Sequence, residues 1–276
     1  MDDLIHLLNL GFLAKYFLMG VLFYLPLERL FPIHLGQKIF RKGWGSDLTC
    51  LFINSVMIRA GLTAILVGAV FLGNQWLPGS LHESIAGQPE WLQFLEILLI
   101  GDLGFYATHR LLHSIPSLWR FHRIHHSIEE LDWLAGVRVH VFEQIFVHST
   151  SYVPIMILGF SPIAFAAYVI LYNWHTAFIH CNLRIGLGPL TLLFATPRFH
   201  HWHHSSALED YDKNFAAQLS FIDALFGTLH LPKGRRPVSY GINEKVPENY
   251  FKQLIYPFAP ARPRTPLVQL ATNDKN

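Results

Sequence analysis

The chain has 276 residues, of which 51% are hydrophobic and only 14% charged, and its mean hydropathy is +0.29. An average soluble protein is about 25% charged, so this composition argues against a water-soluble fold and favours a membrane protein. The net charge of +2 gives no sign of nucleic-acid binding, and we expect no nucleic-acid partner.

Five apolar segments follow one another along the chain, at residues 12–27, 60–78, 91–108, 145–158 and 162–178. Some are close to the minimum of roughly 17 residues that a helix needs to cross a bilayer. We therefore predict an all-α fold, a polytopic membrane helical bundle with about four or five spans. The segment 145–158 is short and contains Pro154, so it could instead form a re-entrant hairpin with the segment that follows.

One basic residue interrupts this pattern at the start of the second segment. Arg59 at the centre of a span would cost roughly 2.5 to 3.5 kcal/mol on insertion scales. We therefore begin that helix just after Arg59 and let the guanidinium reach the membrane interface.

The basic residues indicate the orientation of the bundle. If all five segments cross and the N-terminus is outside, the inner loops carry 19 of the 21 Lys and Arg residues. An excess of Lys and Arg marks the cytoplasmic side of a membrane. The sequence thus predicts a multi-pass integral membrane protein, with residues 1–256 as a single domain and residues 257–276 as a flexible, Pro-rich tail.

Histidines are concentrated on the predicted cytoplasmic side. Thirteen of the seventeen lie between His109 and His204, and helices bring residues three or four apart onto one face. Neutral imidazole is a common metal ligand, so the clusters predict a metal site on a cytoplasmic helical cap. Two apolar segments separate the second cluster from the third, so the chain crosses and returns to the same side. The clusters are His109 and His113; His122, His125 and His126; and His200, His203 and His204.

The number of histidines favours two metal ions. Imidazole suits zinc, copper, iron and nickel, whereas a structural zinc takes only four ligands. Two irons with open positions would use about eight to ten nitrogens and still admit dioxygen. The H-E-x-x-H helix of zinc proteases does not occur in the chain.

These motifs, in this order, resemble the fatty acid hydroxylase and sterol desaturase superfamily over about residues 98–230. Segments 102–106, 212–215 and 221–228 also resemble motifs of that superfamily, and Arg138, His140 and Glu143 resemble its R-x-H-P-x-E segment, with Val141 in place of proline. The resemblance implies that two irons are held by His109, His113, His122, His125, His126, His180, His200, His203 and His204, with His175 and His201 as further candidates.

Three other residues are candidates for orienting the ligands. Asp102 lies one helical turn before the first cluster, where its carboxylate could accept a hydrogen bond from a ligand ring or pair with Arg110. Asp223 has the same two interpretations, and His140 is the third candidate. We assign no separate catalytic acid or base.

The resemblance implies an O2-dependent oxidoreductase that hydroxylates a C–H bond of a fatty acyl or sterol-like lipid entering from the bilayer. Desaturation and ether-lipid cleavage are alternatives at the same site, and a histidine-lined metal or proton transporter is an alternative of another class. The sequence has no H-P-G-G haem segment, so a separate electron donor of the cytochrome b5, ferredoxin or rubredoxin type is expected. We favour a bacterial inner membrane over the endoplasmic reticulum, because the C-terminus carries no retrieval signal.

Overall fold

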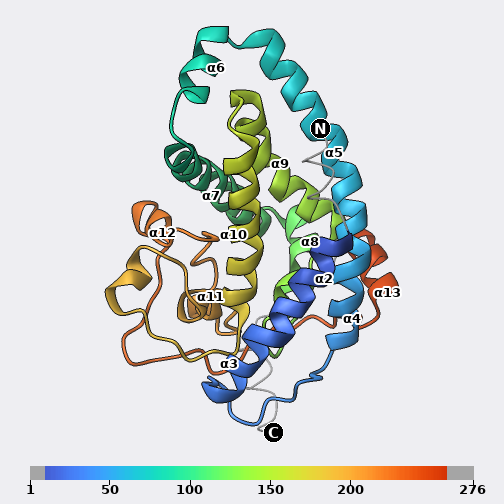
Figure 1. The fold of residues 1–276 in the computed structure, drawn as a ribbon. Coiled ribbons are helices and arrows are strands. Elements are labelled where there is room, and N and C mark those ends of the chain that lie inside the picture. Colours follow the sequence, from blue (N-terminus) through green and yellow to red (C-terminus); the bar gives the residue numbers. More distant parts are fainter. Residues whose placement is uncertain (1–9, 260–276) are drawn as a thin grey trace, which may run out of the picture.

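A computed structural model describes residues 10–259, and within that range the regular secondary structure is helical (Figure 1). This confirms the predicted all-α class. The helices are α2 (Leu10–Met19), α3 (Leu25–Leu30), α4 (Trp44–Thr49), α5 (Ser55–Trp76), α6 (Gly79–Ala86), α7 (Glu90–Ser114), α8 (Pro116–His126), α9 (Val141–Leu158), α10 (Pro162–His180), α11 (Pro197–His203), α12 (Phe221–Leu225) and α13 (Tyr250–Ile255). Short π-helical stretches, Gly20–Tyr24 and Cys50–Asn54, join α2 to α3 and α4 to α5.

Three helical stretches in the described part of the chain are long and apolar enough to cross a membrane: Trp44–Trp76, Val141–Leu158 and Pro162–His180. They contain the second, fourth and fifth apolar segments, and Pro154 lies within the second of these helices. The first stretch is a continuous helix of 33 residues, so Arg59 lies near its middle. The prediction that this helix begins after Arg59 is therefore wrong.

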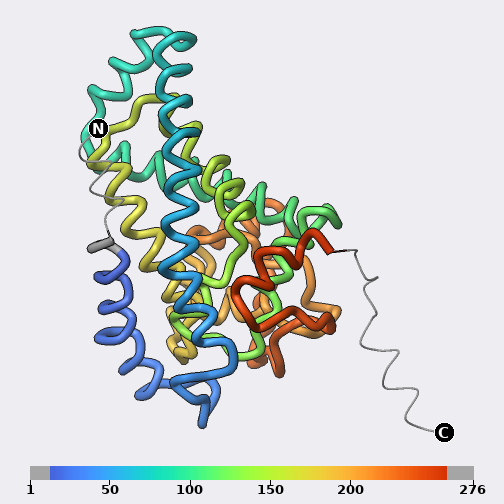
Figure 2. Tube along the Cα trace, turned by 90° about the vertical axis from the view of Figure 1, so that its right-hand side faces the viewer, coloured from blue at the N-terminus to red at the C-terminus, as the bar shows by residue number. Residues whose placement is uncertain are grey.

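The two remaining apolar segments are helical as well, but they do not meet the same criteria. Segment 12–27 falls in α2 and α3, and segment 91–108 falls in α7. Helix α7 carries Glu96, Asp102 and Arg110, and it runs across α5 instead of alongside it (Figure 2). The described residues thus support three spans, and a count of four or five stays a prediction.

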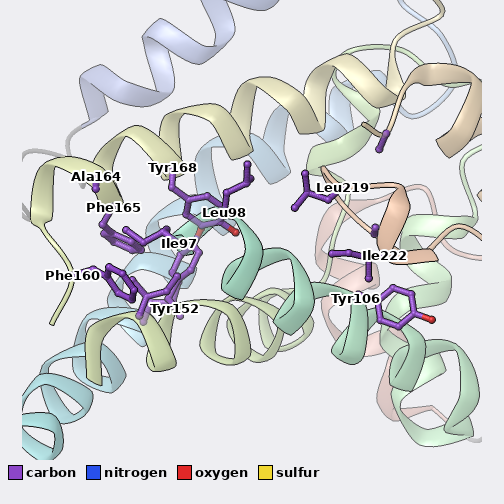
Figure 3. Packing of buried hydrophobic residues seen from close by; sticks show 14 of the residues in the cluster. Ile97, Leu98, Tyr106, Tyr152, Phe160, Ala164, Phe165, Tyr168, Leu219 and Ile222 are labelled. Atoms are coloured by element: carbon purple, nitrogen blue, oxygen red, sulfur yellow. The ribbon is translucent and has the colours of Figure 1, made fainter. Parts of the chain in front are cut away.

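Apolar side chains from α7, α9 and α10 form the main core (Figure 3). Ile97, Tyr152 and Tyr168 meet where the three helices cross, and all are buried. The same cluster continues through Leu219 and Ile222 to α12. This core fixes α12 and its neighbouring loop against the spanning helices.

Glycines allow the helices to approach closely. A Cβ atom at Gly73 of α5 would lie 2.5 Å from the carbonyl oxygen of Ile157, and one at Gly104 of α7 would lie 2.6 Å from that of Thr150. Small residues are common where membrane helices pack, because they let backbones come together. Both glycines are therefore required by contact with the α9 backbone.

A buried ion-pair network joins the start of the first spanning helix to the segment before α9. Asp47 accepts hydrogen bonds from Arg41 at 2.7 Å and from both the Nε and Nη2 of Arg138. Arg41 also pairs with Asp132 at 2.7 Å. The predicted flexible tail lies mostly outside the described residues, and its first residues end a short helical turn, Tyr256–Phe258.

Replacement of Gly104 by valine should push α7 away from α9, because the new side chain would meet the backbone of Thr150. We expect a clear fall in the thermal unfolding temperature of the detergent-solubilised protein, since overpacking of this kind typically costs about 1 to 3 kcal/mol. Gly68→Val, at a position with open space around its Cβ, is the control. Equal unfolding temperatures for the two variants would contradict this packing.

Candidate metal centre

Nine buried histidines form two groups in the described structure. The ligand atoms of each group lie within 4.8 Å of one another. The first group consists of His109, His113, His122, His126 and His203, and the second of His125, His180, His200 and His204. The structure thus brings together all eight histidines of the three motifs, with His180 added.

Local helix geometry explains how the groups are divided. In α8, His122 and His126 are four residues apart and join the first group, whereas His125 joins the second. At α11 the division is reversed, because His200 and His204 join the second group and His203 the first. Each of these helices therefore contributes to both groups.

Backbone carbonyls fix the proton positions on several rings. The Nδ1 atoms of His109 and His203 bond to the carbonyl oxygens of Phe215 at 2.7 Å and Lys213 at 2.8 Å. In the second group, His125 and His180 bond to the carbonyl oxygens of Arg138 at 3.2 Å and Thr176 at 2.7 Å. A carbonyl oxygen only accepts hydrogen bonds, so each ring carries its proton on Nδ1 and an unshared electron pair on Nε2.

Within each group, the Nε2 atoms of neighbouring rings face one another. The distance is 3.0 Å between His109 and His122, and 3.2 Å between His125 and His180. The Nε2 atom of His203 is buried and has no hydrogen-bond partner among the described residues. Two unprotonated nitrogens repel each other at such distances unless a cation lies between them. Nitrogens that each sit about 2.1 Å from one ion would be roughly 3.0 to 3.4 Å apart, so the rings fit a metal in each group.

Two carboxylates support rings of the first group. Glu143, buried at the start of α9, accepts a hydrogen bond from His122 Nδ1 at 2.7 Å, and Asp212 contacts His113 Nδ1 at 3.1 Å. Carboxylates in this position orient a metal-bound imidazole and raise its basicity. In the sequence, both residues stand out only as parts of segments that resemble family motifs. A glutamate two residues into an apolar helix was the available signal for Glu143.

Comparison with known proteins agrees with this geometry. Residues 94–228 match the family model described as fatty acid hydroxylase. Ornithine lipid hydroxylase OlsE of Rhizobium tropici is 33% identical over 244 residues, which cover 84% of this chain and 71% of the relative. The chain belongs to the fatty acid hydroxylase family. The resemblance drawn from the histidine motifs is confirmed, and the protein is an oxidoreductase of this family.

Two further relatives show the range of the family. Alkylglycerol monooxygenase of Danio rerio is 34% identical over 156 residues, covering 56% of this chain but only 33% of the relative. Methylsterol monooxygenase 1 of Gallus gallus is 25% identical over 227 residues, covering 78% of this chain and 73% of the relative. No solved structure matches the chain.

Asp102 and Asp223, which were expected to orient the ligand rings, act on them through the backbone of a loop. Asp102 accepts hydrogen bonds from the backbone nitrogens of residues 217–219, and Asp223 accepts from those of Phe215 and Ala216. Neither is hydrogen-bonded to a ligand ring, and Asp102 forms no ion pair with Arg110. Both instead hold the loop whose Phe215 carbonyl orients His109. In place of the expected hydrogen bond to a ligand ring, the two aspartates position His109 through the loop backbone.

Three other candidate histidines lie outside both groups. The Nδ1 atom of His175 bonds to the carbonyl oxygen of Ala217. Five residues separate it from His180, and a helix of 3.6 residues per turn therefore directs the two rings to different faces. His201 bonds to the Tyr240 hydroxyl and to the carbonyl oxygen of Cys181. His140 contacts Leu254 and the backbone nitrogen of Phe142, so it caps α9 instead of supporting a ligand.

Burial keeps the rings neutral. Burial and neighbouring imidazoles lower the pKa values of His126, His200 and His204 well below the ordinary value of 6.5, and burial lowers the pKa of His203 to about 3. Metals bind deprotonated imidazole, so the folded protein offers these ligands without first losing protons near pH 7.

Glu143→Gln should weaken metal binding about 10- to 100-fold, as loss of a supporting carboxylate does elsewhere. Metal retained after dialysis against graded chelator measures the change. Glu129→Gln, at an exposed glutamate paired with Lys42, is the matched control. Equal retention in the two variants would show that Glu143 does not support a bound metal.

The metal-free protein should lose stability as the pH falls below about 6.5. The folded-state pKa values lie below the unfolded value, so the stabilisation is complete above pH 6.5. It is lost at about 1.4 kcal/mol per pH unit for each buried histidine as the unfolded chain takes up protons. Unfolding temperatures recorded between pH 7.5 and 5 should fall, and less steeply in His203→Phe. A constant unfolding temperature would contradict the buried, neutral state of the rings.

Proposed function

We propose that this protein is a di-iron, O2-dependent enzyme that hydroxylates a C–H bond of a membrane lipid. One observation carries the proposal. The structure contains a cavity of about 240 Å³. One part of its wall is formed by His109, His125, His180 and His200, and the rest by side chains that include those of α5, α9 and α10. A lipid lying between the apolar helices would therefore have a path to both histidine groups.

The two groups suit two ions of the same kind. Five histidines would hold one iron and four the other, and the second group leaves room for dioxygen. Bound non-haem iron supplies the electron acceptance and oxygen activation that oxidation of an unactivated carbon requires. Zinc has no such redox chemistry, so a zinc-stabilised scaffold does not account for membership of this family.

The chain's own residues shape the place where the lipid would react. Phe105 lines the cavity between His109 and Tyr172, with ring centroids 5.1 Å and 6.0 Å away. These aromatic rings exclude water beside the histidines and restrict the positions that a carbon chain can take. Exclusion of water protects a reactive oxidant from side reactions.

The relatives favour monooxygenation over the alternatives. Hydroxylation of a lipid is named for the Rhizobium tropici relative, and ether-lipid oxidation at the same site is the second candidate because of the match to alkylglycerol monooxygenase. Desaturation is the third. Transport is disfavoured because the histidines gather where the spans end: His180 is the last residue of α10, and α9 begins at Val141.

The orientation proposed from the sequence places this end of the bundle in the cytoplasm. Lys42 and Arg184 are exposed near the ends of the spans that lie nearest the histidines. The bacterial relative supports an inner-membrane location. A separate acidic electron donor, of the cytochrome b5, ferredoxin or rubredoxin type, would be attracted to this basic face.

Lipid mass spectrometry of cells that express the intact protein tests the proposal. We expect a lipid species that has gained one oxygen, absent from cells expressing His125→Ala, because that change removes a ligand of the second group. His201→Asn, next to His200 but outside both groups, should keep most of the product. A species that has lost two hydrogens instead would identify a desaturase, and identical lipids in all cells would contradict an oxygenase.

A further inference from the structure

Arg59 lies on the face of α5 that lines the cavity. It lies within a continuous helix that is long enough to span the membrane, among the cavity-lining residues Ser55, Leu62 and Thr63. An ionisable side chain within a span that faces a cavity is expected to serve function, because its insertion into lipid is unfavourable. Arg59 is not among the proposed metal ligands, so the metal centre does not explain its presence.

The packing of α5 against α9 fixes the level of Arg59 in the cavity. The two helices run in parallel with a nearly constant offset, so Arg59 lies level with Glu143 and Gln144, and Thr63 level with His148. Three pairs of neighbouring residues show this register: Asn54 with Val139, Gly61 with Ile145, and Gly73 with Ile157.

His148 presents a hydrogen-bond donor at this level. The side-chain nitrogen of Gln144 lies 2.8 Å from His148 Nε2. An amide nitrogen donates, so Nε2 accepts and the ring proton is on Nδ1. That Nδ1 atom is buried and has no hydrogen-bond partner in residues 10–259. Asn173 of α10 also lines the cavity, one residue from Tyr172, whose ring packs on His148 at 5.3 Å.

Arg59, Gln144, His148 and Asn173 therefore form a polar belt within the cavity. Glu143, which contacts the ligand His122, lies at the edge of the belt nearest the histidines and precedes His148 by five residues, or about 7.5 Å along the helix axis. On the other side the wall is lined by apolar and aromatic residues such as Leu66, Tyr152 and Phe165. The order along the cavity is thus histidines, polar belt, apolar end.

We propose that the polar belt binds the acidic group of an anionic lipid while the hydrocarbon chain occupies the apolar end. Carboxylate or phosphate oxygens would accept hydrogen bonds from the Arg59 guanidinium and from His148 Nδ1. Arginine suits this role because its planar group pairs with either anion. The acidic group is then held close to the histidines, so the carbon exposed to them lies within a few bonds of that group.

The predicted position of oxidation on the lipid depends on the proposed function, whereas the predicted binding of the acidic group does not. In the hydroxylation, one atom of O2 enters the C–H bond. The other leaves as water with two protons and two electrons from the separate donor protein. The polar belt determines only which C–H bond is presented.

Binding is measured on the full chain in detergent without metal, so it does not depend on oxidation. Native mass spectrometry would compare retention of palmitate, dipalmitoyl phosphatidate and the neutral hexadecanol. We expect an acid to be retained about tenfold more tightly than the alcohol, and the preferred acid identifies the head group. Arg59→Gln and His148→Phe should remove this preference, and Arg59→Lys should keep part of it.

Arg184→Gln, at an exposed arginine outside the cavity, is the matched control and should behave as wild type. Unfolding temperatures show whether each variant is folded. Equal preference for the acid in wild type and in folded Arg59→Gln would overturn the proposal.

The position of the product gives a second, independent result. Tandem mass spectrometry of the oxidised acid should place the hydroxyl within the first few carbons from the acidic group, and a hydroxyl near the methyl end would overturn the proposal. Acid binding that depends on Arg59, with no oxidation by iron-loaded protein, would contradict the proposed function and leave the binding site supported.

Discussion

Buried imidazoles that turn unprotonated nitrogens toward one another are the constraint on which the structure depends. The Nε2 atoms of His109 and His122 lie 3.0 Å apart, and those of His125 and His180 lie 3.2 Å apart. The Nδ1 atom of His122 bonds to the Glu143 carboxylate, and those of the other three rings bond to carbonyl oxygens, so each Nδ1 proton is held away from the neighbouring rings. A cation at the centre of each group would satisfy the facing nitrogens, and α8 and α11 each present rings to both groups.

Buried carboxylates on two sides of the site hold the carbonyl groups that anchor the rings. On one side, Asp102 and Asp223 bind successive backbone nitrogens and so fix the loop that presents the Phe215 carbonyl to His109. On the other side, Asp47 holds Arg138, whose carbonyl accepts from His125. Acidic residues far from the metal positions thus determine ring orientation through the backbone.

Eight of the nine histidines could be predicted from the sequence because their spacing within short helices is a local property, and His180 was added by the family resemblance. His175 and His201 stayed open candidates, since the direction of each ring depends on the rotation of its helix in the bundle. Glu143 and Asp212 contact residues 21 and 99 positions away, so no spacing reveals them. Arg59 lies within the first spanning helix and lines the cavity, while its expected place at a membrane interface stays a prediction. The composition indicated a membrane protein, and the lengths of the helices identify three of them as long and apolar enough to be spans.

The division of rings within α8 and α11 has a consequence for how the proposed pair of irons would be loaded. Each helix gives ligands to both groups, so an ion that enters one group also restrains the helices that build the other. The second ion then meets ligands that have already lost much of their conformational freedom, which makes its uptake more favourable. Loading of the proposed site with two irons would therefore be cooperative, and chains with a single iron would be a minor species at partial saturation.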